Sequence, residues 1–565
     1  MSYSGRIINK LNKHSRIITQ VKSQGASQAM LYGAGFSKDD MKKAQVCIFS
    51  NWYDSNPCNS HLINLQNKVK DNFTYLKGLR VNSVGVSDGI SMGTEGMKYS
   101  LPSRELIADS YESTMMGHSY DSGITIPGCD KNIPGALIGM IRVNRPSMMI
   151  YGGTIESGNY NGKPVDIVSA FQSYGEYLKG DINDEEREKL LSYCCPKTGG
   201  ACGGMYTANS MALASELLGM TLPNSSSNPA NSEDKIQECL NSEHTLINML
   251  ENDITPKSIL SKRSFENAIK TVISVGGSTN VILHLLAIAH TAKIDLTLKD
   301  FDRLSKNTPI IGDFKPSGKY LMEDLHKIGG TSTLVKYLIE ERIIDGDCLT
   351  ITGKTIHENV LNYSNLSKEQ TVIKSINKPL QKTGNFKILT GNLAPRGCVA
   401  KISNKEDNYF KGPAKVFNNE NDMIQALENN KINEGDVIVI NFQGPKSGPG
   451  MPEMLKPSSA LVGYGLEGKV ALITDGRFSG GSCGFIVGHI CQESQEGGLI
   501  AVLEDNDMIT INIDKGKISA DIDQEEIFNR YSVIYKYFPK RKNISGYLDK
   551  YIKLVSSSDK GCYTC

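Results

Sequence analysis

The chain has 565 residues, a length that allows two to four domains and several buried cores. Its 62 Lys and Arg nearly balance its 61 Asp and Glu, so no nucleic-acid partner is expected, and its most apolar helical stretch, residues 281–289, is too short to cross a membrane. Thirteen scattered Cys argue against a disulfide scaffold and predict reduced thiols in a cytoplasmic protein.

In the first part of the chain, short apolar runs alternate with helical patterns and end in Gly-rich turns. The runs at 81–86 and 148–151 predict buried strands, and the alternation is typical of an α/β domain. A charged helix is predicted at about 181–191, and residues 264–290 predict two helices with a Gly-Gly break at 275–280. Such a break is usually a turn, although it can also bring a ligand close to the backbone.

The composition becomes polar and loop-like between residues 351 and 386, so we place a domain boundary near residue 375. Residues 1–375 then form a larger N-terminal α/β domain, and residues 376–565 form a smaller C-terminal domain. In the second domain, strand-like runs separated by Gly-rich turns predict a β-rich, barrel-like fold with one helix at about 423–429. The runs are 414–417, 436–441, 469–474, 499–503 and 508–513.

Three cysteines lie in turns rich in Gly, Pro and Asn: Cys58, Cys129 and Cys202. A buried structural Cys usually has apolar neighbours, so these three require another explanation. Their spacings of 71 and 73 residues exclude a local zinc finger, and any shared metal must be assembled by the tertiary fold. Three thiolates would leave one iron of a cluster open to act as a Lewis acid. Spacing alone leaves three separate free thiols as the alternative.

Carboxylates and one Ser lie in similar turns. Asp88 follows a strand-like run, Asp130 directly follows Cys129, and Glu453 lies beside the Gly/Pro-rich loop 444–452. Oxygen ligands of this kind suit Mg²⁺, although each one alone is better explained by an ordinary turn or a solvated side chain. Ser479 follows the predicted strand 469–474 in a turn that is not a nucleophile elbow. It could act as a base only if nearby cations lowered its pKa.

The remaining motifs carry little information about function. The Gly-Gly pairs form neither a dinucleotide fingerprint nor a P-loop, so nucleotide cofactors are disfavoured. The C-x-x-C at 562–565 is predicted to be a frayed tail, and the adjacent Cys194 and Cys195 are predicted to form a turn.

Taken together, these segments resemble the dihydroxy-acid dehydratase family, within the larger group that also holds phosphogluconate and sugar-acid dehydratases. The resemblance runs in order from about residue 10 to the end, which argues against a transit peptide in front of it. Position 483, often His in the family, is Cys here, and no direct role is expected for it. The matching segments are 22–30, 56–59, 88–93, 101–109, 127–132, 202–211, 391–395, 444–454 and 474–481.

The resemblance implies the roles of eight residues. A [2Fe-2S] cluster would be held by Cys58, Cys129 and Cys202. A Mg²⁺ ion would be held by Asp88, Asp130, Glu453 and a carbamylated Lys131. Carbamylation matters because an ammonium repels a dication, whereas the CO₂ adduct is an anionic oxygen ligand. Ser479, as an alkoxide, would remove the proton from C2 of the substrate.

The implied reaction removes water from a 2,3-dihydroxy carboxylate. Its substrates would be 2,3-dihydroxy-3-methylbutanoate and 2,3-dihydroxy-3-methylpentanoate, and its products the 2-keto acids that precede valine and isoleucine. The family fold implies that the C-terminal domain carries Glu453 and Ser479, with the active site between the domains. A homodimer is also implied.

Three alternatives remain. A sugar-acid dehydratase of the same family would need hydrogen-bonding groups in its pocket, whereas a branched-chain substrate predicts an apolar wall. An iron–sulfur sensor would need a fourth ligand, for which Cys195 and His61 are candidates. A zinc-stapled scaffold is disfavoured by the long Cys spacings.

Overall fold

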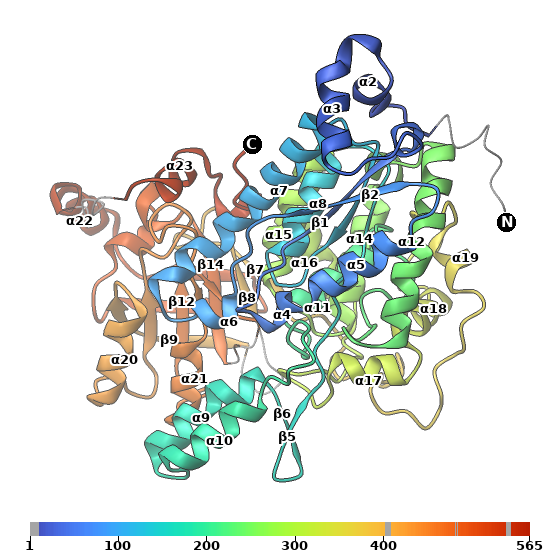
Figure 1. Cartoon of the computed structure of the whole chain (residues 1–565). Coiled ribbons are helices and arrows are strands. Elements are labelled where there is room, and N and C mark those ends of the chain that lie inside the picture. The colour runs from blue at the N-terminus through green and yellow to red at the C-terminus, as the bar shows by residue number, and fades with distance from the viewer. Residues whose placement is uncertain (1–10, 402–407, 481, 483, 538–543) are drawn as a thin grey trace.

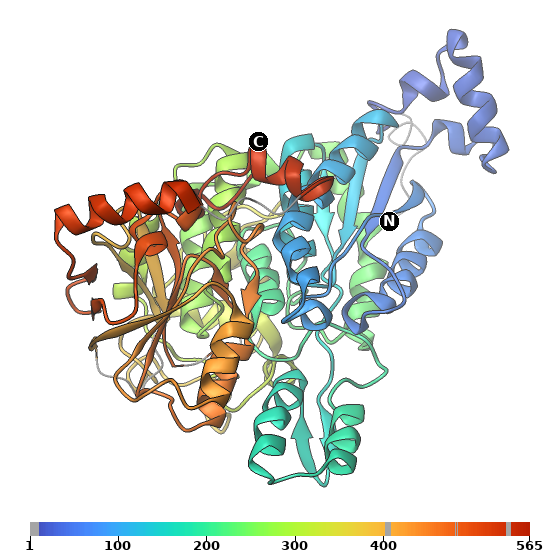
Figure 2. The ribbon, with the colours of Figure 1, turned by 90° about the vertical axis from the view of Figure 1, so that its left-hand side faces the viewer.

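The computed structural model describes residues 11–401, 408–480, 482, 484–537 and 544–565, and Cys483 lies outside them. The chain forms two lobes side by side, a larger one from the N-terminal part and a smaller one from the C-terminal part (Figure 1). At the N-terminus, the short helices α2 (Arg16–Thr19) and α3 (Gly25–Gly33) project away from the larger lobe (Figure 2). Among the described helices, none is both long and apolar enough to cross a membrane.

The larger lobe is built on a four-stranded parallel sheet with the order β2-β1-β3-β4. All six residues of β1 are buried, as expected for a parallel strand covered on both faces. The predicted run 81–86 overlaps β2 only at residues 81 and 82, and beyond the strand the Asn51 side chain donates to the Val84 carbonyl (2.7 Å). The strands are β1 (Gln45–Ser50), β2 (Lys77–Asn82), β3 (Ser122–Ile126) and β4 (Ser147–Met149).

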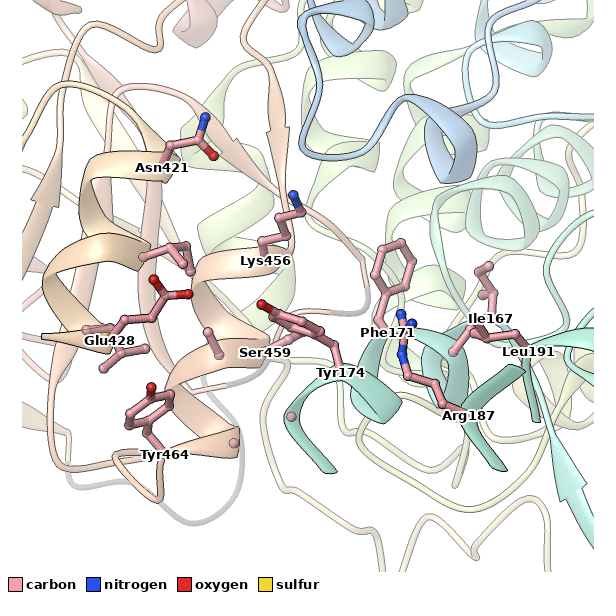
Figure 3. Close-up of a pocket in the computed structure, with 16 residues that line it drawn as sticks. Ile167, Phe171, Tyr174, Arg187, Leu191, Asn421, Glu428, Lys456, Ser459 and Tyr464 are labelled. Carbon is pink, nitrogen blue, oxygen red and sulfur yellow. The ribbon is translucent and has the colours of Figure 1, made fainter. Parts of the chain in front are cut away.

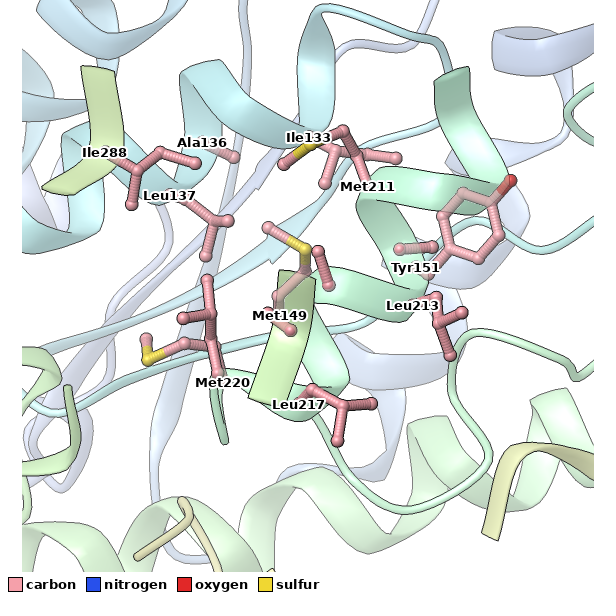
Figure 4. Close-up of a cluster of buried hydrophobic side chains, with 14 of the residues drawn as sticks. Ile133, Ala136, Leu137, Met149, Tyr151, Met211, Leu213, Leu217, Met220 and Ile288 are labelled. Carbon is pink, nitrogen blue, oxygen red and sulfur yellow. The ribbon is translucent and has the colours of Figure 1, made fainter. Parts of the chain in front are cut away.

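Helices pack around this sheet and form the main core. Figure 4 shows side chains of α8 (Asn132–Val143), α11 (Thr207–Leu217) and α15 (Asn280–Ala292) meeting residues of β4. The predicted pair of helices is confirmed, because α14 (Lys262–Ser274) ends just before the Gly-Gly break and α15 starts after it. The predicted charged helix is α10 (Asp184–Tyr193), which forms a projecting hairpin with α9 (Ile167–Lys179) (Figure 2).

The other elements of this lobe connect or cover these layers. They are α4 (Pro57–Ser60), α5 (Leu62–Asn72), α6 (Asp88–Ser91), α7 (Ser100–Gly117), β5 (Gly158–Tyr160), β6 (Lys163–Val165), α12 (Glu233–Asn252), α13 (Pro256–Ile259), α16 (Leu298–Lys306), α17 (Met322–Lys327), α18 (Gly330–Glu340) and α19 (Ile356–Val360).

The smaller lobe contains an eight-stranded sheet with the order β16-β15-β9-β10-β12-β14-β8-β7. Thr390, just after β7, bridges to Lys517 in β16, so the two edges of the sheet meet and the predicted barrel-like fold is confirmed. Gly391 is required at this closure because a Cβ there would lie 1.8 Å from the Ile518 carbonyl oxygen. The strands are β7 (Phe386–Leu389), β8 (Gly397–Lys401), β9 (Tyr409–Phe417), β10 (Val437–Ile440), β12 (Ala471–Thr474), β14 (Phe485–Cys491), β15 (Met508–Asn512) and β16 (Lys517–Ala520).

Helices α20 (Glu420–Glu428), α21 (Lys456–Gly463) and α22 (Gln524–Tyr537) accompany the barrel, and α20 is the helix predicted in this domain. Helix α23 (Tyr547–Leu554) packs against the larger lobe, where Tyr551 shares a buried cluster with Leu101 of α7 and Leu283 of α15. One predicted strand is wrong, because residues 499–502 form a 3₁₀ helix. All four side chains are buried, and the Ala501 amide bonds the Gly498 carbonyl (2.9 Å). An apolar run with no polar face does not distinguish a strand from a buried helical turn.

The C-terminal tail is packed, so the prediction of a frayed end is also wrong. Cys562 is fully buried, and the Arg104 guanidinium on α7 donates to the carbonyls of Gly561 (2.9 Å) and Cys562 (2.8 Å). The Tyr563 ring stacks on His290 at 3.8 Å. Arg104 is itself fully buried beside Glu105, so the tail supplies two of the acceptors that its charge needs.

We therefore expect a chain truncated after Lys560 to be less stable by about 3 kcal/mol, because two hydrogen bonds to a buried guanidinium are lost. Differential scanning fluorimetry would show a lower melting temperature. A chain lacking only the exposed Cys565 is the matched control and should melt like the parent. Equal melting temperatures for all three chains would contradict this role of the tail.

Candidate active site

The predicted site residues come together although they lie far apart in the sequence. Seven of them line one cavity of about 280 Å³, and Lys131 is fully buried against three of the seven. Those lining the cavity are Cys58, Asp88, Cys129, Asp130, Cys202, Glu453 and Ser479. Three of the supporting turns follow β1, β2 and β3, whose carboxyl ends meet at one edge of the parallel sheet.

The turns of Cys58 and Cys129 are held together by a chain of amide side chains. The Asn56 side chain donates to Asn59 (2.7 Å), and Asn59 donates to the Asn132 side-chain oxygen (3.0 Å). The same oxygen accepts from the Cys129 backbone N–H (2.9 Å). Sequence reasoning missed this role of Asn59 and Asn132, although both residues adjoin the cysteine motifs.

Cys202 is positioned by a second amide, Asn209 on α11. Its side chain donates to the carbonyls of Cys202 (2.8 Å) and Gly204 (2.7 Å) and accepts from the Tyr151 hydroxyl (2.8 Å). Asn209 and Tyr151 are fully buried. The Cys202 turn is therefore fixed from the core side of the lobe, while the residue itself lines the cavity.

The Cys58 thiol lies next to the thiols of both Cys129 and Cys202. Hydrogen bonds of Cys58 with the Cys129 and Cys202 thiols, together with burial, raise the pKa of Cys58 well above its ordinary value. These residues would become three thiolates only if a cationic group offset their charge. Of the two candidate fourth ligands, Cys195 lines the cavity, whereas His61 places its Nε2 2.7 Å from the Gly152 carbonyl oxygen.

Next to the thiols lies a cluster of three carboxylates. One oxygen each of Asp88, Asp130 and Glu453 lies within 4.8 Å of the other two. Lys131 contacts Asp88 and lies 3.0 Å from Glu453 and 3.7 Å from Asp130. Ser100, at the start of α7, donates to Asp88 (2.6 Å). Oxygen atoms this close would repel one another without a cation among them.

The pKa values of this cluster follow from burial and charge. Burial raises the pKa of Asp130 to about 7, against the opposing effect of Lys131. Burial also disfavours the charged form of Asp88, but Lys131 and Arg477 outweigh it and lower the pKa. For Lys131, burial and Arg477 lower the pKa, while Asp88, Glu453 and Asp130 raise it, and the net shift is upward. An unmodified Lys131 is therefore an ammonium that balances the carboxylates.

Glu453 and Ser479 come from the smaller lobe on two short parallel strands. Strands β11 (Glu453–Met454) and β13 (Arg477–Phe478) pair with Glu453 opposite Arg477. The fully buried Arg477 donates to Glu453 (2.6 Å) and to the Met451 carbonyl (2.7 Å). Ser479 follows β13 directly, and its backbone N–H bonds the Met454 carbonyl (2.9 Å).

Two supporting residues of Glu453 were not predicted. One is Arg477, which donates to Glu453 (2.6 Å). Asn280, at the end of the Gly-Gly break, donates to Glu453 (3.1 Å) and to Thr207 (3.1 Å). The break therefore places the Asn280 side chain beside Glu453.

One wall of the cavity is apolar. Two polar residues beside it have protein partners: Ser157 donates to Glu323 (2.7 Å), and Asp166 accepts from Lys315 (2.8 Å) and caps α9. The buried Tyr206 hydroxyl also lines the cavity and has no hydrogen-bond partner among the described residues. The apolar wall consists of Ile90, Met92, Ile155, Ile167, Val168, Phe171, Leu321 and Leu455.

A larger groove of about 770 Å³ lies on the other side of α9, between the α9–α10 hairpin and helices α20 and α21 (Figure 3). Ile167 and Phe171 line both the groove and the site cavity, so α9 separates the two. The groove contains none of the eight predicted site residues.

Family models and curated proteins match nearly the whole chain. A family model described as dihydroxy-acid/6-phosphogluconate dehydratase N-terminal matches residues 43–359, and its C-terminal counterpart matches residues 371–562. A curated protein of Francisella tularensis subsp. novicida named dihydroxy-acid dehydratase is 54% identical over 98% of this chain and 99% of its own length.

Two eukaryotic relatives are nearly as similar. The Saccharomyces cerevisiae protein named "Dihydroxy-acid dehydratase, mitochondrial" is 51% identical over 98% of this chain and 96% of its own length. The Arabidopsis thaliana protein named "Dihydroxy-acid dehydratase, chloroplastic" is 51% identical over 98% of this chain and 91% of its own length. The chain belongs to the dihydroxy-acid/6-phosphogluconate dehydratase family.

Proposed function

We propose that this chain dehydrates 2,3-dihydroxy-3-methylbutanoate and 2,3-dihydroxy-3-methylpentanoate to the 2-keto acids that precede valine and isoleucine. The names of relatives at 51–54% identity over nearly the whole chain support this substrate class. The observation that carries the proposal is the cavity itself, in which carboxylates and thiols face a wall of aliphatic and aromatic side chains. A short branched hydrocarbon fits that wall, whereas a hydroxylated chain would lose hydrogen bonds to water there.

We propose that Cys58, Cys129 and Cys202 hold a [2Fe-2S] cluster. All three line one cavity from separate parts of the larger lobe, and the Cys58 thiol lies next to the other two, which suits a shared group better than three independent thiols. Cys195 also borders this cavity. The three-cysteine ligand set is the one that the family resemblance implies.

We further propose that Asp88, Asp130, Glu453 and a carbamylated Lys131 hold Mg²⁺. The close carboxylate oxygens are hard ligands of the type that Mg²⁺ prefers. When bound, the cluster and Mg²⁺ supply Lewis-acid chemistry for departure of the 3-hydroxyl and for polarisation of the carboxylate and the 2-hydroxyl. Carbamylation would exchange the repulsive charge of Lys131 for an anionic oxygen ligand.

Side chains of the protein would carry out the remaining steps. Ser479, at the rim between the two lobes, would take the proton from C2 of the bound substrate as a general base. Arg477 and Asn280 would keep the Glu453 carboxylate fixed through their hydrogen bonds of 2.6 and 3.1 Å. The apolar wall would exclude water while the enol product tautomerises to the keto acid.

The proposed setting is a homodimer in the cytoplasm. The dimer rests on the family resemblance. The location rests on the reduced thiols, although the yeast and plant relatives carry organelle names.

Anaerobic turnover assays test the proposed function. We expect keto-acid formation from 2,3-dihydroxy-3-methylbutanoate with a kcat/KM about 100-fold above that for gluconate, because the wall offers few partners for extra hydroxyls. Omission of Mg²⁺ from chelator-treated protein is the control. Product mainly from gluconate would instead identify a sugar-acid dehydratase, and absence of product from both would favour an iron–sulfur sensor.

A further inference from the structure

A buried lysine lies next to the turn that carries Ser479. Lys401 is the last residue of β8, and only 5% of its surface is exposed. Its ammonium donates to the carbonyl oxygens of Gly480 (3.0 Å) and Ser482 (3.3 Å). Both carbonyls belong to the turn that starts at Ser479, so Lys401 binds the main chain within three residues of the proposed base.

The other side of the same turn is fixed to the strand that carries Glu453. The Ser479 backbone N–H and the Ser482 hydroxyl both bond the Met454 carbonyl, at 2.9 and 3.3 Å. The Ser482 N–H closes the turn on the Ser479 carbonyl (3.0 Å). The turn is thus held between β11 on one side and Lys401 on the other. Loss of either attachment would leave the Ser479 hydroxyl less well oriented.

The charge of Lys401 matters as well as its hydrogen bonds. A serine hydroxyl becomes a base only where cations stabilise its deprotonated form. Arg477 precedes the turn, but its guanidinium already bonds Glu453 and the Met451 carbonyl. Lys401 brings a second buried positive charge to the Ser479 turn, in an environment where solvent screening is weak.

We infer that Lys401 is a positioning residue for Ser479. Its hydrogen bonds hold the 479–482 turn in place, and its ammonium charge favours the deprotonated form of Ser479. The inference rests on the proposed function, in which Ser479 is the general base. It adds a residue of β8, 78 positions before Ser479, to the catalytic requirements of the chain.

The test compares Lys401→Met, Lys401→Gln and Lys401→Arg in the full-length protein with bound cluster and Mg²⁺. We expect the Met variant to lose about 100-fold in kcat with KM nearly unchanged, because the interaction acts on the reacting state and not on substrate binding. The acid limb of its kcat profile should move upward by about one pH unit or more, since the serine loses a stabilising charge. The Arg variant should recover part of the rate and most of the pH profile.

Lys387→Met is the matched control, because Lys387 lies on the adjacent strand β7 and bonds Thr383 (3.2 Å), away from the Ser479 turn. It should behave like the parent. If the Lys401→Met variant does not fold, the kcat and pH profile of the Lys401→Gln variant provide the same test. Parent-like kcat and pH profile in the Met or Gln variant would overturn the role of Lys401, as would a loss that the Arg variant does not relieve.

A Ser479→Ala variant separates this inference from the function on which it rests. If Ser479→Ala is inactive while Lys401→Met is normal, only the role of Lys401 fails. If Ser479→Ala retains parent activity, the base assignment fails and Lys401 has no base to position. If the parent protein converts neither substrate, the proposed function itself fails.

Discussion

Replacement of Ser479 by Ala is expected to lower turnover of 2,3-dihydroxy-3-methylbutanoate by about 10³-fold or more, the range for loss of a general base. The backbone N–H of residue 479 would still bond the Met454 carbonyl, so the turn should keep its shape. The visible absorption of the cluster and the Mg²⁺ affinity should therefore match those of the parent. Steady-state assays, absorption spectra and calorimetry on one preparation would measure all three.

Ser482→Ala is the matched control for this prediction. Ser482 lies in the same turn and is 1% exposed, and its hydroxyl makes one bond, of 3.3 Å, to the Met454 carbonyl. Loss of the Ser482 hydroxyl should lower turnover by only a modest fraction. Activity of Ser479→Ala close to that of Ser482→Ala would remove Ser479 from the role of base and leave the proton to another group.

Several of the proposed ligands lie in turns that follow strands, because Cys58, Asp88 and the segment 129–131 come after β1, β2 and β3. Carboxyl ends of parallel strands meet at one edge of a sheet, so turns after β1, β2 and β3 converge whatever their separation in sequence. The barrel was predictable for a similar reason, because short strands with regular turns favour a closed sheet. The type of secondary structure was harder to predict for fully buried runs. The run at 499–502 is an example, because a fully buried segment carries no periodic signal.

The supporting polar residues could not be predicted in the same way. Asn59 and Asn132 are 73 positions apart, Lys401 and Gly480 are 79 apart, and Arg104 reaches a carbonyl 457 positions away. Each is an ordinary polar residue in its local sequence, and its partner is set only by the tertiary fold. Burial then makes these bonds necessary, because an unpaired buried amide or cation is costly. The sequence thus indicates the groups that carry chemistry more readily than those that hold them.

The family resemblance implies that Lys131 is a carbamate, whereas the carboxylates around it favour its ammonium form. Without CO₂, its ammonium contacts Asp88 and lies 3.0 Å from Glu453, so it occupies the region that Mg²⁺ would use. The same carboxylates raise its pKa, which opposes formation of a carbamate because CO₂ adds only to the neutral amine. Mg²⁺ and CO₂ should therefore bind cooperatively, since each removes an obstacle to the other.

This conflict makes Lys131→Met a discriminating experiment. If the carbamate is a ligand, the variant should bind Mg²⁺ about 100-fold more weakly than the parent in bicarbonate, and it should lose turnover. If Lys131 is only a counter-ion for the carboxylates, removal of the ammonium should strengthen Mg²⁺ binding, and bicarbonate should have no effect on the parent. Calorimetric titration of Mg²⁺ with and without bicarbonate separates these outcomes.

Lys131→Arg is the control that keeps the positive charge but forms no carbamate. It should fold like the parent, because a cation remains between Asp88 and Glu453, and it should bind Mg²⁺ weakly at every bicarbonate concentration. The Met variant should remain folded if Asp130, whose pKa is already about 7, takes up a proton to relieve the repulsion. A Mg²⁺ affinity that rises with bicarbonate in the parent, and in neither variant, would assign the carbamate to Lys131.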